Sequence, residues 1–254
     1  MRALGRLSVR NHRGVSVPAV LGLLLMIGGL VSVAAAALNG WINAAGAVAS
    51  GAALMVAVAG LVDDVTPTGP RGLQGHLTAF VHGQVTTGAV KLLVITGAAL
   101  VTVAAGARPG SLIRLCGVLL IAGSANLWNG LDVRPGRAIK WFLVVAATGV
   151  VWIPHAGPFA IGVTVGALVA LAPDLRERAM LGDAGANLLG FTAGVALYVR
   201  SPESWIPFEA IAVVALNIVA DTVSLSRVID AVPPLRWFDR AGQVRAERAE
   251  ETGG

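Results

Sequence analysis

Long apolar runs separated by short polar segments occupy this sequence from about residue 17 to residue 226. A helix needs about 20 consecutive, mostly apolar residues to cross a bilayer. Runs near that length lie at approximately 17–38, 44–62, 86–105, 112–126, 138–153, 158–173, 184–199 and 206–226. The fourth and sixth runs are short or interrupted. The pattern predicts an all-α fold, a polytopic transmembrane helix bundle of about eight spans.

The composition agrees with a membrane protein. Hydrophobic residues make up 56% of the chain and charged residues 13%, whereas soluble domains carry about 25% charge. Glycine is abundant, with 32 residues, and small residues let membrane helices pack closely. The single cysteine, Cys116, lies in an apolar run. No intrachain disulfide or cysteine-based zinc site can form.

The positive charges predict an orientation. The net charge of +5 is carried in short loops between apolar runs, so we expect a lipid bilayer as partner and no nucleic acid. With eight spans, one side holds fifteen basic residues and the other holds three, namely Arg108, Arg114 and Arg200. Lysine and arginine favour the cytoplasmic side. We therefore expect both termini to be cytoplasmic and the protein to lie in the cell inner (plasma) membrane.

The aspartates gather on the same side. All eight lie on or next to the expected cytoplasmic face, at positions 63, 64, 132, 174, 183, 221, 230 and 239. Asp230 and the glutamates of the tail are interpreted as ordinary solvated loop charge. We expect one membrane domain over residues 1–240, followed by a charged cytoplasmic tail at 241–254.

Asp63 and Asp64, at the end of the second run, form the first candidate site. Adjacent ionised carboxylates repel one another, so keeping both charged favours a bound cation, and hard oxygen ligands suit Mg²⁺. Acidic residues beside the bilayer are costly and usually functional. The alternative is an ordinary charged loop end.

Two further segments carry polar groups at run ends. Asn126, Asn129 and Asp132, followed by Arg134 and Arg137, could hold sugar hydroxyls and phosphate oxygens, or could simply form a polar helix cap with charged anchors. In the second segment, residues 182–187, Asp183 stands between glycines and could bind a metal, or it could cap the seventh span.

Two isolated side chains complete the candidate set. Lys91 is the only basic residue well inside a span, so it could bind substrate or extend its amine to the membrane surface. His76, in the first long cytoplasmic loop, could contact phosphate or could be a solvated side chain.

In this order, the segments resemble the polyprenyl-phosphate N-acetylhexosamine-1-phosphate transferases, a superfamily that includes phospho-MurNAc-pentapeptide translocase. The matching places are Arg13-Gly14 to Pro18, Asp63-Asp64, Asn126 to Asp132, Gly182 to Gly185, and Asp221-Thr222 with the later Asp239-Arg240. Together they cover nearly the whole chain. The resemblance implies a shortened member, because the family usually has about ten spans.

The resemblance also implies an activity. Family members transfer a phospho-N-acetylhexosamine from a UDP-N-acetylhexosamine to undecaprenyl (polyprenyl) phosphate, with Mg²⁺ and release of UMP, in cell-wall or envelope synthesis. The expected roles are catalytic for Asp63, Asp64 and Asp132, and metal-binding for Asp64 and Asp183. The expected substrate-binding residues are Asn126, Asn129, Arg134, Arg137, Lys91 and His76. A homodimer is a further possible arrangement.

Some residues depart from the family pattern. The family's loop reads Asn-Leu-x-Asp-Gly, and this chain has Asn129 at the aspartate position. The histidine motif that follows Asp-Arg in the family is absent after Arg240. An alternative function is therefore a catalytically impaired relative that binds polyprenyl phosphate or scaffolds envelope enzymes. A transporter is less favoured, because transporters place charges near the bilayer midplane.

Overall fold

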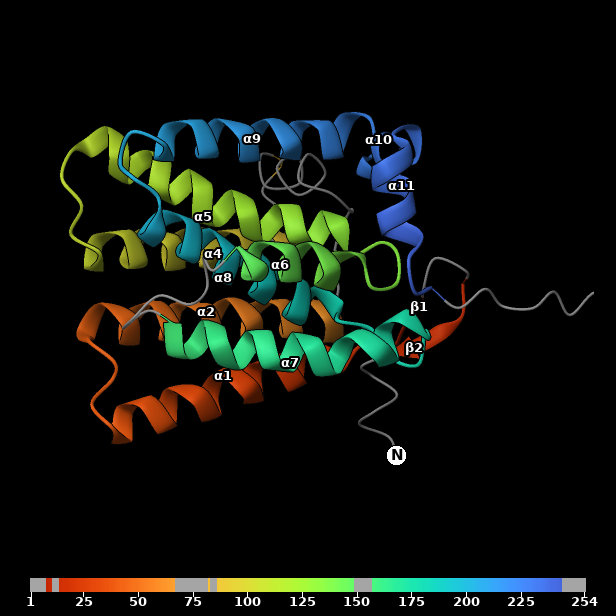
Figure 1. The fold of residues 1–254 in the computed structure, drawn as a ribbon, viewed down its shortest axis with the longest axis horizontal. Helices are drawn as coiled ribbons and strands as arrows, with labels where there is room; N and C mark the ends of the chain where they lie inside the picture. The colour runs from red at the N-terminus through yellow and green to blue at the C-terminus, as the bar shows by residue number, and fades with distance from the viewer. Residues whose placement is uncertain (1–7, 11–13, 67–81, 83–85, 149–156, 244–254) are drawn as a thin grey trace, which may run out of the picture.

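The structure is a computed structural model that describes residues 8–10, 14–66, 82, 86–148 and 157–243. Its helices are α1 (Leu21–Leu38), α2 (Ala44–Val65), α4 (Thr87–Ala105), α5 (Ser111–Leu131), α6 (Arg137–Ala147), α7 (Gly157–Leu175), α8 (Gly182–Arg200), α9 (Ile206–Thr222), α10 (Leu225–Ala231) and α11 (Pro233–Arg240). The long helices lie alongside one another, and α10 and α11 sit across one end of the bundle (Figure 1). The predicted all-α class is confirmed.

The predicted count of eight spans is not confirmed. Each of the eight predicted runs coincides with a helix. Within the described part of the chain, the helices long and apolar enough to cross a membrane are α1, α2, α4, α5 and α7. A sixth span results if α9 and α10, which meet at a bend of 98°, count as one. These helices support a multi-pass membrane protein. The chain termini fall outside the described residues.

Helix α8 shows why the two counts differ. Fourteen of its residues are buried, and it packs against α1, α2, α5 and α6 (Figure 1). A helix enclosed by protein does not need the continuous apolar surface that lipid demands, so α8 accommodates Asn187 and Thr192. Helix α6 differs from a membrane span in its length, because it has only 11 residues and ends at Ala147.

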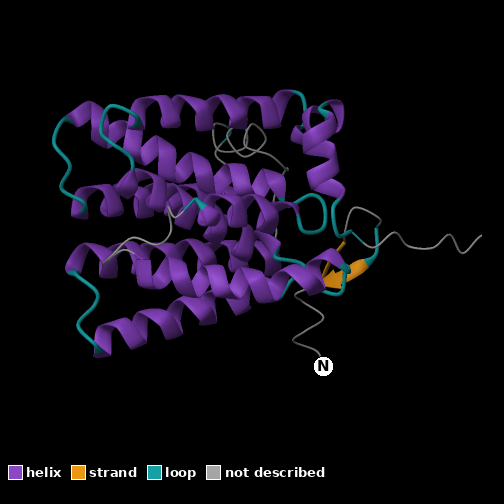
Figure 2. Ribbon diagram, in the orientation of Figure 1, coloured by secondary structure: helices purple, strands orange, loops and turns teal. Residues whose placement is uncertain are grey.

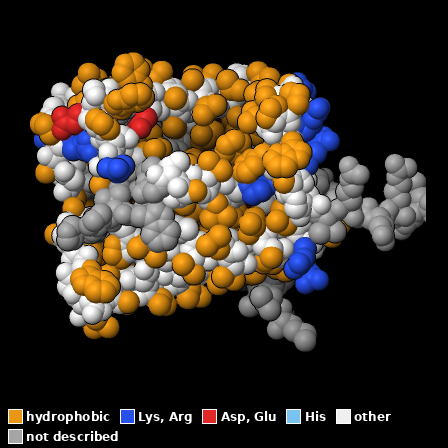
Figure 3. Space-filling model, viewed as in Figure 1, with side chains coloured by type: hydrophobic (Ala, Val, Ile, Leu, Met, Phe, Trp, Pro, Cys, Tyr) orange, Lys and Arg blue, Asp and Glu red, His pale blue; other side chains and the backbone are white. Residues whose placement is uncertain are grey.

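Exposed apolar side chains cover the flanks of the bundle (Figure 3). Large exposed apolar surfaces are typical of contact with a membrane or with another protein, and here they coincide with the helices that are apolar enough to span a membrane. Exposed tryptophans lie at both ends: Trp41 and Trp205 near the α1–α2 turn and the start of α9, and Trp237 in α11. Tryptophan is enriched at the two membrane–water interfaces, so these residues fit the edges of a bilayer-embedded bundle.

A short hairpin, absent from the sequence-based expectation, precedes α1 (Figure 2). Strands β1 (Ser8–Arg10) and β2 (Ser16–Pro18) pair antiparallel, with Val9 opposite Val17. The end of β2 then joins the segment before α8, because the Met180 N–H donates to the Pro18 carbonyl over 2.8 Å. This pairing brings the start of α1 beside the start of α8, the position of the expected site.

Candidate functional site

Lys91 joins two carboxylates that come from different helices. Its ammonium donates to Asp63 Oδ2 of α2 over 2.7 Å and to Asp183 Oδ2 of α8. The Lys91 side chain is 9% exposed and that of Asp63 is 13% exposed. Thr87, one turn before Lys91 on α4, donates its hydroxyl to Asp63 Oδ1. We call these four residues, together with Asp64, the Lys91 cluster.

The positive charge between Asp63 and Asp183 is the Lys91 ammonium. A lysine inside an apolar helix is costly unless it is paired. Here two carboxylates surround it, so Lys91 turns inward to the cluster and does not extend to the membrane surface.

Asp64 serves the start of α8. Its carboxylate accepts the backbone N–H groups of Asp183 and Ala184, at 3.0 and 3.1 Å. The first N–H groups of a helix lack partners within the helix, and they favour negative charge. The cap on α8 is therefore supplied by Asp64 from α2. The alternative of a cap by Asp183 is not seen, because Asp183 lies inside the helix and the residue before the helix is Leu181.

Two glycines let these segments approach closely. A Cβ on Gly60 would lie 2.6 Å from the Asp183 carbonyl, and one on Gly182 would lie 2.6 Å from Asp64 Oδ2. Gly182 also has a φ of +66°, which residues with a Cβ rarely adopt. The glycines flanking the aspartates thus have a steric role in forming the site.

Asp132 lies next to the Lys91 cluster. It follows the last residue of α5 and lines a narrow crevice with Asp174, Glu177 and Met180. Burial raises the pKa of the Asp132 carboxyl well above its usual range, and the carboxylates of Asp174, Asp183 and Asp64 raise it further. Four aspartates of the predicted site therefore lie near one another at one end of the bundle.

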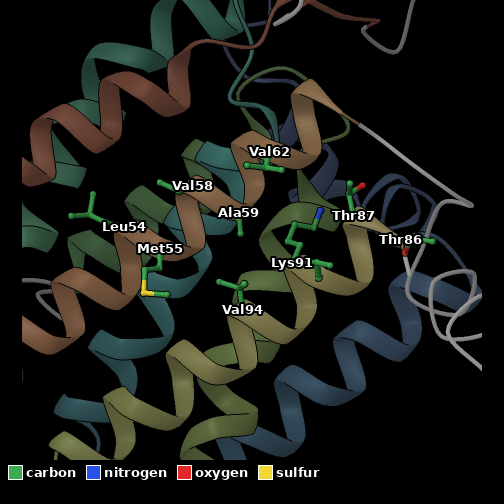
Figure 4. Close-up of a pocket in the computed structure, with 10 residues that line it drawn as sticks. Leu54, Met55, Val58, Ala59, Val62, Thr86, Thr87, Lys91 and Val94 are labelled. Atoms are coloured by element: carbon green, nitrogen blue, oxygen red, sulfur yellow. The ribbon is translucent and has the colours of Figure 1, made fainter. Parts of the chain in front are cut away.

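An apolar groove leads to the cluster from the side of the bundle (Figure 4). Its volume is about 620 Å³, and it lies between α2 and α4. The lining residues are Leu54, Met55, Val58, Ala59, Val62, Thr86, Thr87, Val90, Lys91 and Val94. The Lys91 amine points toward the end where Thr87 lies (Figure 4). One groove thus connects an exposed apolar wall of the bundle with the buried charges.

The predicted arginines are engaged elsewhere. Arg137 is fully buried, and its guanidinium forms two hydrogen bonds with Asp239 of α11, at 2.6 and 2.9 Å. Arg134 pairs with Asp230 at 2.8 Å and with Asp239 at 3.3 Å. In this conformation Arg137 is out of reach of a soluble ligand. Asp230, interpreted from sequence as solvated loop charge, is instead an ion-pair partner.

The two predicted asparagines lie on α5. Asn126 donates to the side chain of Asn217 on α9 over 2.7 Å, and it lines a second groove with that residue. Asn129 is half-buried in the last turn of α5. The predicted His76 lies outside the described residues. Sequence reasoning missed Thr87, whose only signal was its position one helical turn before Lys91.

The described carboxylates do not form a ready-made site for a divalent metal. Among the described residues, no group of three histidine, cysteine or acidic side chains lies close enough together to hold a metal ion. Asp63 and Asp183 share the Lys91 ammonium, and Asp64 binds the start of α8. Asp63, Asp64, Asp132 and Asp183 supply oxygen ligands of the kind that Mg²⁺ prefers, but in this arrangement they do not converge into a metal site.

No protein-family model and no curated protein matches this sequence significantly.

Proposed function

We propose that this protein is a divergent membrane transferase that moves a phospho-N-acetylhexosamine from a UDP-N-acetylhexosamine to undecaprenyl (polyprenyl) phosphate. The reaction takes place at the cytoplasmic face of the inner membrane and serves cell-wall or envelope polysaccharide synthesis. One observation carries the proposal: the apolar groove between α2 and α4 ends at the Lys91 cluster. A reaction between a lipid phosphate and a water-soluble donor needs such a junction.

The groove suits the lipid substrate. Its walls are aliphatic, and Met55, Val58 and Val62 are exposed on the outside of the bundle. A prenyl chain lying along this wall is shielded from water. Its phosphate then lies near Thr87 and Lys91, and Lys91 has a third N–H that can donate to an oxygen.

The carboxylates suit the donor side of the reaction. To hold Mg²⁺, Asp64 and Asp183 would have to exchange their present partners for the ion, which would then offset the negative charge of the UDP-sugar diphosphate. In this proposal Asp132, which follows the last residue of α5 beside the Lys91 cluster, takes the proton from the lipid phosphate. The Lys91 ammonium holds the carboxylates of Asp63 on α2 and Asp183 on α8 close together.

The direct test is UMP release. Purified protein is incubated with undecaprenyl phosphate, Mg²⁺ and a panel of UDP-N-acetylhexosamines, and UMP is measured. We expect turnover with one donor and a loss of about 100-fold or more in Asp132→Asn. Glu203→Gln, at the opposite end of the bundle, is the matched control and should keep full turnover. Absence of turnover with every donor in folded protein contradicts the proposal.

A second candidate function is a non-catalytic relative that binds polyprenyl phosphate or scaffolds envelope enzymes. It is favoured by the internal pairing of Arg134 and Arg137, which leaves these cations engaged with α11. This candidate predicts that Asp63→Asn and Asp183→Asn keep both cellular function and lipid binding. Lipid binding is measured by the amount of undecaprenyl phosphate retained through purification, and the transferase proposal predicts loss of cellular function in the same variants.

A further inference from the structure

Helix α11 presents a tryptophan between two arginines on its outer side. Trp237 is 75% exposed, and Arg236 and Arg240 beside it are also exposed. Arg240 has one long contact with Asp230, at 3.4 Å. An indole flanked by arginines is typical of segments that lie in the headgroup region of a bilayer, because the ring is amphipathic and the arginines reach phosphate.

The inner side of α11 fixes this arrangement. Asp239 is 1% exposed and binds the fully buried Arg137 through two hydrogen bonds. Phe238 packs edge-on against Trp141 of α6, with 5.1 Å between ring centroids. Lys140 donates to the carbonyls of Phe238 and Asp239. The exposure of Trp237 is therefore imposed by a helix docked on the bundle.

The position of α11 places Trp237 at the edge of the bilayer. Helix α9 lies along the apolar bundle, and the chain then turns by 98° into α10, so α10 and α11 run across the end of the bundle (Figure 1). If the long helices cross the membrane, this end meets the headgroups.

Among the described residues, most of the exposed charges at this end of the bundle are positive. Asp174 and Asp239 are buried, and the exposed carboxylate in this set is Asp221. Five arginines are exposed at the same end: Arg176, Arg178, Arg227, Arg236 and Arg240. Lys and Arg atoms line this end of the molecule in the space-filling view (Figure 3). The surface is therefore complementary to anionic headgroups, and each such arginine near an anionic membrane adds to its attraction.

We propose that the outer side of α10 and α11 is an anchor for anionic phospholipid headgroups, with Trp237 inserted at the interface and Arg227 and Arg236 binding lipid phosphates. The anchor holds α11 against the membrane surface and thereby fixes the end of the bundle that carries the Lys91 cluster. It stands independently of the transferase proposal, because it uses neither the groove nor the carboxylates.

Lipid-dependent quenching tests the anchor. The full-length protein is reconstituted in nanodiscs that mix phosphatidylcholine and phosphatidylglycerol, with one of the two lipids brominated. The contribution of Trp237 is the difference in fluorescence between the wild type and Trp237→Phe. We expect that contribution to be quenched more strongly by brominated phosphatidylglycerol than by brominated phosphatidylcholine, and the difference to shrink at high salt.

The arginine variants separate insertion from headgroup binding. Arg227→Gln and Arg236→Gln should each lower the preference for phosphatidylglycerol by roughly fivefold, while quenching by brominated phosphatidylcholine is retained. Arg200→Gln, an exposed arginine at the opposite end, is the matched control and should keep the preference. Absence of Trp237 quenching by either lipid overturns the anchor. Equal quenching by both lipids, unchanged in the variants, overturns the assignment of the arginines to lipid phosphate.

Discussion

Gly182 adopts a left-handed backbone conformation one residue before the carboxylate that Lys91 binds. At the same point its missing Cβ leaves room for Asp64. The chain therefore needs a glycine here both for its backbone angle and for space. Asp64 in turn satisfies the first N–H groups of α8, so one small residue couples the shape of the site to the start of a helix.

Gly182→Ala tests this coupling. The new Cβ would meet Asp64 Oδ2 at 2.6 Å with φ at +66°, so we expect destabilisation of about 1–3 kcal/mol. Thermal unfolding of the purified protein measures the change. Gly51→Ala in α2 is the control, because nothing lies within 4 Å of its added Cβ. An unchanged melting temperature in Gly182→Ala would refute this account.

Asp239 provides a pH prediction. Burial raises its pKa, but the guanidinium of Arg137, aided by Lys140 and Arg134, outweighs this and holds the pKa below 3.8. The folded state therefore binds the proton less readily than the unfolded state. The ion pair contributes its full stability above pH 3.8 and loses it as the pH falls through the lower, folded-state pKa.

The melting temperature of the wild type should therefore fall steeply below about pH 4. Asp239→Asn should be less stable at neutral pH and should show a shallower acid decline. Asp221→Asn, which changes an exposed carboxylate at the end of α9, should keep the wild-type profile. Parallel acid declines in the wild type and Asp239→Asn would count against the ion pair.

At the scale of elements, α2 and α4 form the groove together while α8 supplies the third side of the Lys91 cluster. The helices themselves follow from hydropathy, since every predicted run became a helix. Which helices pack against one another does not follow from hydropathy, because packing depends on small residues and buried polar pairs that hydropathy does not record. Asp239 and Arg137, 102 residues apart, are an example.

Val58→Trp tests the groove. Val58 is 48% exposed and lines the groove wall on α2, so an indole there should occupy space that a prenyl chain needs. We expect the KM for undecaprenyl phosphate to rise about tenfold. This corresponds to losing about 1.4 kcal/mol of apolar contact between the prenyl chain and the groove. The melting temperature should stay near that of the wild type.

Ile27→Trp is the matched control for this variant, since Ile27 is exposed on α1 and does not line the groove. Its KM for the lipid should remain at the wild-type value. If both tryptophan variants change the KM equally, the prenyl chain does not lie between α2 and α4.

At the scale of the whole molecule, the class and the membrane helices were predictable, because long apolar runs leave few alternatives. The sequence also indicated that Asp63, Asp64, Asp132 and Asp183 lie near one another, because all four fall on the same expected face of the membrane. The role of Lys91 was not, because the sequence cannot show whether a lysine within a span turns toward protein or water. The short hairpin before α1 was missed, since three-residue strands carry little pattern.

Cysteine labelling tests the predicted orientation. The distribution of positive charges predicts that the α11 end lies in the cytoplasm. Asn39→Cys, in the exposed α1–α2 turn, should therefore react with a membrane-impermeant maleimide in intact cells. Arg178→Cys, exposed between α7 and α8, should react only after permeabilisation. The native Cys116 is buried and should give little background. The reverse labelling pattern would invert the assigned topology.

The enclosure of α8 also has a consequence for biogenesis. The helices that surround it, α1, α2, α5 and α6, all precede it in the chain. During synthesis from the N-terminus, the partners of α8 are therefore already present when it leaves the ribosome. A helix with Asp183, Asn187 and Thr192 partitions poorly into lipid by itself. It can instead enter the bilayer against a protein surface that has been laid down before it.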